Sequence, residues 1–260
     1  MEPNNISNEA QQIERNNHNP SQTIVGNNTS QKVLVGNVED SNDVDWYKVN
    51  LPANLETILA INPTLGVLKF EVHDEYFNRI FNEEVSKDPN FLGAKPHYVQ
   101  IQSEGTYYVK VSNAAGASGE YRFTIGSPNY SVASYQYKAV NPLTLTTTIK
   151  IATDTYNLSH ITEVPEKAVV YKVTFDGTKV NSATSETRKL KLQSDSSWIS
   201  TASYTWVANV PISSDPSSSL NKKFHSIWSV QLGGNVSSIN KTYSLTPKIT
   251  FSYYYPVLPQ

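Results

Sequence analysis

The chain has 260 residues and a net charge of −2, with 21 Lys and Arg against 23 Asp and Glu, and it contains no Cys. This charge balance argues against a nucleic-acid-binding protein, which normally carries a strong basic excess. The lack of Cys excludes disulfide bonds, thiol nucleophiles and cysteine–zinc sites. No stretch approaches the ~18 consecutive apolar residues that a membrane-spanning helix requires, so we expect no transmembrane segment.

Short segments of alternating apolar and polar residues follow one another along the first half of the chain. They lie at residues 32–36, 45–51, 57–61, 67–72, 98–101, 106–111 and 121–125, with turn residues between them. Alternation with a period of two, in segments rich in Val, Ile, Tyr and Thr, is typical of strands with one buried face. The regular spacing of these segments predicts an antiparallel β-sandwich.

The same pattern returns in the second half of the chain, at residues 169–175, 190–192, 204–207, 227–232 and 248–253. Asp176-Gly177 follows the first of these segments, and this dipeptide is a hairpin signal because it adopts the tight turns that join antiparallel strands. We therefore predict an all-β chain in which two antiparallel β-sandwiches, of jelly-roll or immunoglobulin-like type, follow one another.

Charge and aromatic content both change at one place in the chain. Up to Pro128 there are 9 Lys and Arg against 16 Asp and Glu, whereas from Asn129 onward there are 12 against 7. Six of the 16 Tyr precede Asn129 and ten follow it. Residues 126–129, Gly-Ser-Pro-Asn, form a turn-rich cluster at the same place. We predict two domains, residues 1–127 and residues 130–260.

Three groups of residues in the first half follow a distinctive order. Glu2-Pro3-Asn4-Asn5 opens the chain, residues 35–38 precede Asp43-Val44-Asp45-Trp46-Tyr47-Lys48-Val49, and residues 105–111 and 119–125 form the last two expected strands. In order and spacing these segments span nearly all of residues 2–126 and resemble the bacterial pre-peptidase C-terminal domain family. That family includes the collagen-binding domains of clostridial collagenases. The second half resembles no family that we can name.

The resemblance implies a β-sandwich with an accessory, non-catalytic role on an exported protein, because domains of this family accompany secreted proteases and other exoproteins. No peptidase precedes it in this sequence, so the resemblance gives no ground for proteolytic activity. The family's opening motif begins directly after Met1, so we expect residue 2 to be a mature or domain start, with a signal peptide removed ahead of it. The expected location is extracellular.

Four carboxylates crowd one short loop, at Glu39, Asp40, Asp43 and Asp45. Like charges this close repel each other unless water or a cation compensates them, and Ca²⁺ takes six to eight oxygen ligands. The resemblance implies that the opening segment and this loop bind Ca²⁺ jointly. The residues concerned are Glu2, Asn4, Asn5, Asp40, Asp43 and Asp45. The alternative is a solvated turn without a metal, in which Asp45 caps a strand.

Aromatic residues concentrate in the second half. Consecutive tyrosines in a strand, such as Tyr253, Tyr254 and Tyr255, must point to both faces, so at least one is expected to be exposed unless both faces are covered. We treat these three residues and Trp206 as candidate ligand contacts, because aromatic rings offer rigid contact area at low entropic cost. The alternative for each of them is packing inside the protein.

Motifs for catalysis are lacking in the sequence. The five His show no metal-site spacing, and neither a His-Glu-x-x-His helix nor a Gly-x-Ser-x-Gly turn occurs. His73-Asp74-Glu75 is the one polar cluster of interest, and it lies where a strand gives way to a turn. We therefore predict a protein that is not an enzyme.

The sequence as a whole predicts a secreted, non-enzymatic binding or adhesion protein whose partner is an extracellular polymer or cell-surface ligand, either protein or glycan. We expect the binding surface to lie chiefly in the second half. The alternative is an exotoxin component in which residues 182–205 form a membrane-inserting hairpin, since Lys189 and Lys191 share one strand face while Leu190 and Leu192 share the other. That alternation breaks at residues 194–197.

Overall fold

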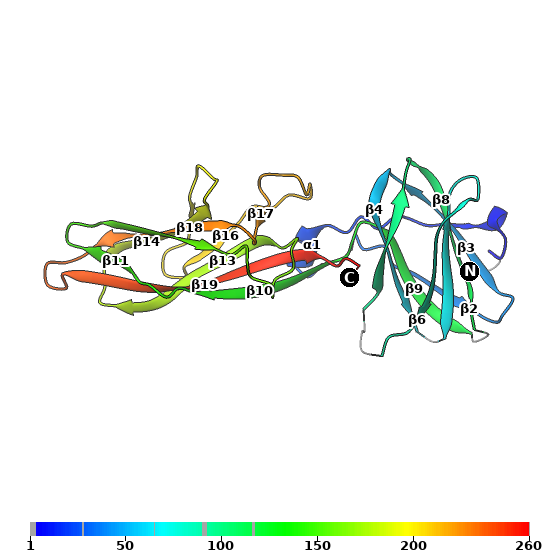
Figure 1. Ribbon diagram of the computed structural model, residues 1–260, viewed down its shortest axis with the longest axis horizontal. Helices are drawn as coiled ribbons and strands as arrows, with labels where there is room; N and C mark the ends of the chain where they lie inside the picture. The colour runs from blue at the N-terminus through cyan, green and yellow to red at the C-terminus, as the bar shows by residue number, and fades with distance from the viewer. Residues whose placement is uncertain (1–3, 28, 65, 90–92, 116–117, 260) are drawn as a thin grey trace. The chain divides into compact units, whose positions relative to one another are not determined.

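Strands make up most of the chain in the computed structural model, which describes residues 4–27, 29–64, 66–89, 93–115 and 118–259 (Figure 1). Helical structure among these residues is limited to a 3₁₀ turn at Ser7–Glu9 and to α1, Pro20–Ile24. The prediction of an all-β protein is confirmed. A search of the described residues finds no helix of the length and apolar character that crossing a membrane requires.

Two compact units make up the chain, Met1–Tyr130 with Val257–Gln260, and Ser131–Pro256. The division at Tyr130 lies close to the boundary that we expected between residues 127 and 130. The chain end differs from the expectation, because it belongs to the first unit, where the backbone N–H of Val257 donates to the carbonyl of Asn129 at 2.8 Å. Independent folding of either half stays a prediction.

The first unit contains two sheets. One has the strand order β1-β3-β8-β5-β6 and the other the order β2-β9-β4-β7. β1 runs parallel to β3, and the remaining neighbours are antiparallel. The strand bounds are β1 Gln11–Gln12, β2 Leu34–Val38, β3 Val44–Leu51, β4 Asn54–Pro63, β5 Val67–His73, β6 Arg79–Ser86, β7 Lys95–Ile101, β8 Gly105–Asn113 and β9 Gly119–Gly126.

Alternation along each strand decides which side chains the first unit buries. In β3, Tyr47, Val49 and Leu51 are buried, whereas Trp46 and Lys48 are only partly covered and point to the outer face. The inward sides of both sheets pack into one hydrophobic cluster. The outward side of the five-stranded sheet therefore carries polar and aromatic side chains that lie outside this core.

A buried polar network lies inside this core. The hydroxyl of Tyr121 in β9 donates to Asp45 Oδ2 at 2.5 Å, and the hydroxyls of Tyr121 and Tyr47 lie 2.7 Å apart. Burial, together with these two neighbours, raises the pKa of Tyr121 far above its usual value, so the hydroxyl keeps its proton. Gly36 in β2 makes room for it, because a Cβ there would overlap the Tyr121 hydroxyl.

The second unit is also built from two sheets. A six-stranded sheet follows the order β10-β19-β13-β16, with β11 also paired to β19 and β17 to β13, and a four-stranded sheet follows the order β12-β18-β14-β15. The strand bounds are β10 Tyr130–Lys138, β11 Leu143–Thr146, β12 Ile151–Asn157, β13 Val169–Val180, β14 Thr184–Leu192, β15 Ile199–Ser200, β16 Val207–Asn209, β17 Lys222–Lys223, β18 Ile227–Asn235 and β19 Thr242–Pro256.

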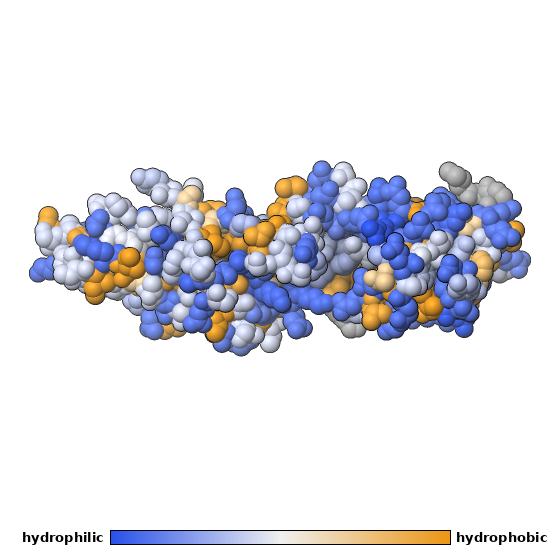
Figure 2. All heavy atoms as spheres, turned by 90° about the horizontal axis from the view of Figure 1, so that it is seen from above, coloured by the Kyte–Doolittle hydropathy of each residue, from blue (hydrophilic) through white to orange (hydrophobic). Residues whose placement is uncertain are grey.

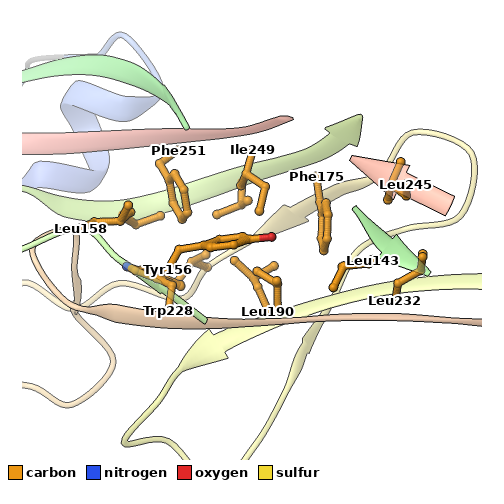
Figure 3. Packing of buried hydrophobic residues seen from close by; sticks show 14 of the residues in the cluster. Leu143, Tyr156, Leu158, Phe175, Leu190, Trp228, Leu232, Leu245, Ile249 and Phe251 are labelled. Carbon is orange, nitrogen blue, oxygen red and sulfur yellow. The ribbon is translucent and has the colours of Figure 1, made fainter. Parts of the chain in front are cut away.

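Large side chains fill the space between the two sheets of the second unit. On the face that Figure 2 shows, residues of intermediate hydropathy predominate, with hydrophilic and hydrophobic residues scattered among them. Inside, Trp228 of β18 is fully buried and packs on Phe251 of β19, with ring centres 5.2 Å apart. Figure 3 shows these two rings together with Phe175 and Leu190, which come from β13 and β14. Both sheets thus contribute to one core.

The hairpin expected at Asp176-Gly177 is wrong. Both residues lie within β13, and the chain reverses later, at Asn181, which has a positive φ of 66°. Gly177 serves a different purpose, because a Cβ there would overlap the backbone oxygen of Thr246 in the neighbouring strand β19. Glycine inside a strand often marks such a close approach of two backbones.

Candidate functional site

Aromatic and charged side chains gather on the outward side of the sheet β1-β3-β8-β5-β6. They come from β3, from β8, from β5 and from the turn between β5 and β6. Trp46 lies opposite Lys110 in the strand register, and Lys110 lies opposite Glu71. We call this group the Trp46 cluster, and its members are Trp46, Glu71, His73, Phe77, Tyr108 and Lys110.

Four rings of the Trp46 cluster contact one another. The ring centre of Trp46 lies 5.4 Å from that of His73, 6.2 Å from that of Phe77 and 6.5 Å from that of Tyr108. Phe77 and Tyr108 are closer still, at 4.8 Å with an interplanar angle of 30°. These separations are those of favourable aromatic pairs, so the rings support one another on the sheet surface.

Phe77 reaches the cluster through a strained turn. Its φ is 61°, a left-handed conformation that bulky residues rarely adopt. Asp74 holds the turn, because its Oδ1 accepts from the backbone N–H of Tyr76 at 2.9 Å and of Asn78 at 2.8 Å. The Phe77 residue nevertheless stays 44% exposed. Strain of this kind, maintained by surrounding bonds, is common where a side chain must be presented to a ligand.

Glu71 is the charged centre of the cluster. Its side chain is 5% exposed, and its carboxylate lies 2.8 Å from Arg79, 3.2 Å from Lys110 and 3.4 Å from Lys69. Burial alone would raise the pKa of Glu71, but hydrogen bonds from Arg79 and Lys110 outweigh it and lower the pKa to about 2. Lys110 also lies 5.6 Å above the Trp46 ring. The ion pairs therefore link the charged and the aromatic parts of the cluster.

A cavity of about 120 Å³ borders the β5–β6 turn. Tyr76, which is 76% exposed, and Ile80 line it together with Gln100 of β7 and with Gln102, which follows that strand. The turn thus carries one exposed ring beside this cavity and a second ring, Phe77, in the Trp46 cluster. An extended ligand that crosses the turn would meet both.

The structure brings part of the predicted calcium set together. The backbone N–H of Trp46 donates to the carbonyl of Asn4 at 2.9 Å, which fixes the opening segment beside β3. The side-chain amide of Asn5, in the orientation that satisfies its hydrogen bonds, donates to Val44 O at 3.1 Å and to Asp43 Oδ1 at 3.2 Å. Glu2 lies outside the described residues.

Carboxylate oxygens of the acidic loop accept hydrogen bonds from backbone N–H groups of the same loop. Asp43 Oδ2 accepts from the backbone N–H of Glu39 at 2.6 Å, and Asp40 Oδ1 accepts from the N–H groups of Asn42 and Asp43 at 2.7 and 3.2 Å. Asp45 points instead into the core, where it is 2% exposed. Within the described ranges, no group of three or more His, Asp or Glu side chains is arranged to hold a metal.

One observation favours a cation beside this loop. Asn4 is 2% exposed, and its side-chain Oδ1 is buried without a hydrogen-bond partner. Buried acceptors of this kind are rare in native proteins, because an unsatisfied oxygen costs stability. A cation at this position would satisfy the Asn4 oxygen, and Asp45 is instead engaged by the Tyr121 hydroxyl in the core. Calcium binding by the opening segment and the acidic loop stays a prediction.

The tyrosine run of β19 is covered on both faces. Tyr253 and Tyr254 are each 4% exposed, and Tyr255 is partly buried with its ring centre 6.1 Å from that of Tyr253. The hydroxyl of Tyr254 donates to Asn221 Oδ1 at 3.4 Å, from the loop that leads into β17. Tyr253 and Tyr254 are thus packed inside the unit, which is the alternative that the sequence left open, and Tyr255 is the member of the run that stays partly exposed.

Trp206 covers a buried cation. Its ring centre lies 4.0 Å from the guanidinium of Arg188 in β14, which has no exposed surface. Arg188 Nη1 donates to the carbonyl of Phe175 at 2.6 Å, and Arg188 Nη2 lies 2.7 Å from Glu186 Oε1. Lys179 is 5.3 Å from the same ring. This arrangement gives Trp206 a packing role that the sequence alone left open.

The segment expected to form a membrane-inserting hairpin is built into the second unit. Its first part is β14, which pairs with β18 along most of its length. Leu190 and Arg188 of this strand are fully buried. Release of the hairpin would therefore remove both side chains from the core, so the geometry offers no support for the exotoxin alternative.

The sequence matches no family model and no curated protein. A solved structure from Eubacterium rectale, described as that of a candidate secreted protein, is similar over 90% of this chain and 77% of its own, with 12% identity and a TM-score of 0.56. The pre-peptidase C-terminal domain of a Bacillus anthracis collagenase aligns over 48% of this chain and 98% of its own, with 16% identity and a TM-score of 0.31. The first likeness shows a shared β fold alone, and the family resemblance of the first half stays a prediction.

Proposed function

We propose that this protein is a secreted, non-enzymatic binding protein that recognises an extended extracellular polymer through the Trp46 cluster. The observation that carries the proposal is the strained turn that holds Phe77 beside Trp46 and Tyr108. Secretion is supported by the resemblance of the first half to an exported family and by the Eubacterium rectale neighbour described as a candidate secreted protein.

The chemistry of the cluster suits a polymer chain. Aromatic rings stack on sugar faces and on extended polypeptides, while Glu71, Arg79 and Lys110 offer charged hydrogen-bonding groups around them. The rings lie on an open sheet surface, and the neighbouring cavity of about 120 Å³ is smaller than the ~300 Å³ at which small-molecule pockets begin. A ligand that lies along the surface therefore fits better than one that is enclosed.

A glycan and matrix-polypeptide array identifies the ligand class, and one pair of variants then tests the site. Phe77→Gly removes the ring and suits the positive φ, so the fold is retained. Tyr204→Gly is the matched control, because Tyr204 is an exposed aromatic residue at φ 70° in the second unit. We expect Phe77→Gly to weaken binding about tenfold or more, as for a contact that carries much of the affinity.

Tyr204→Gly should bind as the unchanged protein does. Equal affinity of all three proteins for the array ligand would place the binding surface elsewhere. Glu71→Gln adds a second measurement, because it keeps the shape of the side chain and removes the charge that orders Arg79 and Lys110. Weaker binding by both Phe77→Gly and Glu71→Gln would support a site that needs rings and ion pairs together.

We also propose that Ca²⁺ stabilises the first unit. The ligands that we propose are Asn4 Oδ1 and the carboxylates of Asp43 and Asp40. The family resemblance also implies Glu2, Asn5 and Asp45, of which Asp45 lies in the core. A bound Ca²⁺ would supply positive charge to the buried Asn4 oxygen and to the acidic loop. The resulting stabilisation should be about 2.7 kcal/mol at a hundredfold excess over Kd.

Thermal unfolding with Ca²⁺ and with a chelator checks this second proposal. The expected rise of the melting temperature is about 5–15 °C. Asn4→Ala and Asp43→Asn should each abolish it. Asp215→Asn is the control, because Asp215 closes a turn in the second unit in the same manner, by accepting from Ser217 N–H at 2.9 Å. If the melting curves with and without Ca²⁺ are superimposable, the acidic loop is a solvated turn that binds no metal, and this second proposal is wrong.

A further inference from the structure

Exposed aliphatic side chains project from one end of the second unit. They lie in or directly beside the turns that join β11 to β12, β13 to β14, and β18 to β19. Figure 2 shows hydrophobic residues beside hydrophilic ones at the left-hand end, where Figure 1 places the start of β19. The residues and their exposed fractions are Ile149 50%, Ile151 57%, Val180 61% and Ile239 89%.

Backbone and side-chain bonds hold these turns together. The side-chain amide of Asn181, in the β13–β14 turn, donates to the carbonyl of Thr242 at the start of β19 at 3.0 Å. The backbone N–H of Gly234, at the end of β18, donates to the carbonyl of Lys150 at 3.1 Å. Thr146, at the end of β11, pairs with Thr242 as well. The aliphatic tips therefore form one surface, which we call the three-turn end.

The charge of the three-turn end is positive. Lys150 and Lys241 are exposed, and among the described residues neither takes part in an ion pair. Lys179 lies 3.1 Å from Glu186, whose carboxylate also binds Arg188 and Tyr243. The remaining turn residues are mostly Ser, Thr and Asn, which are polar but uncharged. Two cations are thus available beside the aliphatic tips.

We propose that the three-turn end docks the protein on a lipid surface with anionic headgroups. In this mode Ile149, Ile239 and Val180 enter the boundary between headgroups and acyl chains. Lys150 and Lys241 then lie at the level of the lipid phosphates. Aliphatic side chains inserted to this depth and lysines at the headgroups are the two attractive forces of peripheral membrane binding.

A protein partner fits this surface less well. Protein interfaces are enriched in aromatic residues and Arg at their centres, and the three turns contain neither. The aliphatic residues stand on separate convex tips, so a complementary protein would need one pocket for each. A fluid bilayer accommodates separate tips without such pockets. The uncharged Ser, Thr and Asn residues between the tips suit the headgroup region.

Sedimentation with lipid vesicles tests the proposal on the full chain. The probes are phosphatidylcholine vesicles and vesicles in which about 30% of the lipid is phosphatidylserine. We expect the protein to sediment with the anionic vesicles and not with phosphatidylcholine alone. Raising the ionic strength from about 0.05 M to about 0.5 M should weaken binding, because salt screens the lysines.

Two pairs of matched variants separate the apolar from the charged contribution. Ile149→Asn combined with Ile239→Asn should weaken vesicle binding at least tenfold, because both side chains are exposed in solution and would be buried in lipid. Leu220→Asn is the control, since Leu220 is 47% exposed in the loop before β17, next to the first residues of β13. It should leave binding unchanged.

Lys150→Glu combined with Lys241→Glu should weaken binding about tenfold or more. Lys138→Glu combined with Lys223→Glu changes the net charge equally at exposed positions outside the three turns, and it should have a much smaller effect. Unchanged melting temperatures would show that all variants are folded. Equal binding to both kinds of vesicle, no sedimentation with either, or equal losses in test and control variants would each overturn the proposal.

Discussion

The two units each bury a charged group in a cluster that contains aromatic rings, but with opposite sign and different access to solvent. In the first unit the buried ion is the carboxylate of Glu71, and its cations remain partly exposed, Lys110 to 29% and Arg79 to 52%. In the second unit the buried ion is the guanidinium of Arg188, and its carboxylate partner Glu186 is only 12% exposed.

The ion pairs of the first unit can therefore rearrange at the surface, whereas those of the second unit are enclosed and cannot. The partly exposed Arg79 and Lys110 can turn toward a ligand at small cost, because water already shares their solvation. Arg188 cannot do so, since moving it would leave a buried charge and uncover the space below Trp206. The same residue types thus form an accessible cluster in one unit and an enclosed one in the other.

The largest effect that would test this contrast is expected from Arg188→Leu. Removing the guanidinium leaves the Phe175 carbonyl without its partner and leaves the largely buried Glu186 with only Lys179 and Tyr243, at a cost of about 3–5 kcal/mol. The melting temperature of the second unit should fall by about 10–20 °C. Lys191→Leu is the control. Lys191 belongs to β14, as Arg188 does, and its ammonium lies 5.3 Å from the ring centre of Trp198, but Lys191 is partly exposed. A small effect of Arg188→Leu would contradict the sealed-site interpretation.

A second test concerns the buried network of the first unit. Tyr121→Phe removes the hydroxyl that donates to Asp45, so a buried carboxylate loses a partner and stability should fall by about 2–3 kcal/mol. Denaturant unfolding measures the change. Tyr107→Phe provides the comparison, because the Tyr107 hydroxyl donates to the neutral carbonyl of Ser103 and its loss should cost about 1 kcal/mol. Equal losses would show that the charge of Asp45 is irrelevant.

Most of the sheet framework could be predicted from the sequence, because a half-buried strand must alternate. The expected segments at 45–51, 67–72, 106–111 and 121–125 all lie within β3, β5, β8 and β9. The sequence did not predict β6. This strand lies at the edge of its sheet, and seven of its eight residues are at least partly exposed, so it needs no alternation of apolar and polar residues. Residues 204–206 form a turn with positive φ at Tyr204 and Trp206, where a strand was expected.

The candidate site was less predictable, because it depends on pairings between distant strands. Alternation in β5 places Lys69, Glu71 and His73 on one face, and that much could be inferred. That Trp46 and Lys110 lie beside Glu71 follows only from the strand order β3-β8-β5, which the sequence does not reveal. The packing of Tyr254 was left open for a related reason, since the loop whose Asn221 accepts from its hydroxyl lies about 30 residues before it in sequence.

The acid response offers a third, smaller test of the Glu71 site. The pKa of Glu71 is lowered to about 2, so its ionised form stabilises the folded first unit above the unfolded-state pKa of about 4.3. That contribution, about 1–2 kcal/mol after screening of the exposed cations, should vanish as the pH falls from about 4.5 to about 2. Hydrogen exchange read separately for each unit measures it.

Glu71→Gln should flatten the acid dependence of the first unit only. The pKa of Glu186 is also lowered, since hydrogen bonds from Tyr243 and Arg188 outweigh its burial, so the second unit keeps its own loss of stability in acid. An unchanged acid profile of the first unit in Glu71→Gln would show that other carboxylates dominate there. A changed profile of the second unit would show that the units are energetically coupled.

The smallest expected effect concerns strain, and it separates the two exposed aromatic turns. Tyr204 is 94% exposed at φ 70°, so its ring contributes little packing and its backbone is strained. Tyr204→Gly should therefore raise the stability of the second unit by up to about 1 kcal/mol, because relief of strain exceeds the added freedom of the unfolded chain. Tyr204→Ala keeps the Cβ and should change stability by less than about 0.5 kcal/mol.

Phe77→Gly should gain less stability than Tyr204→Gly, since loss of the Phe77 ring also removes its contact with Tyr108. Equal gains at both positions would mean that the Phe77 ring contributes nothing to the Trp46 cluster in the absence of ligand.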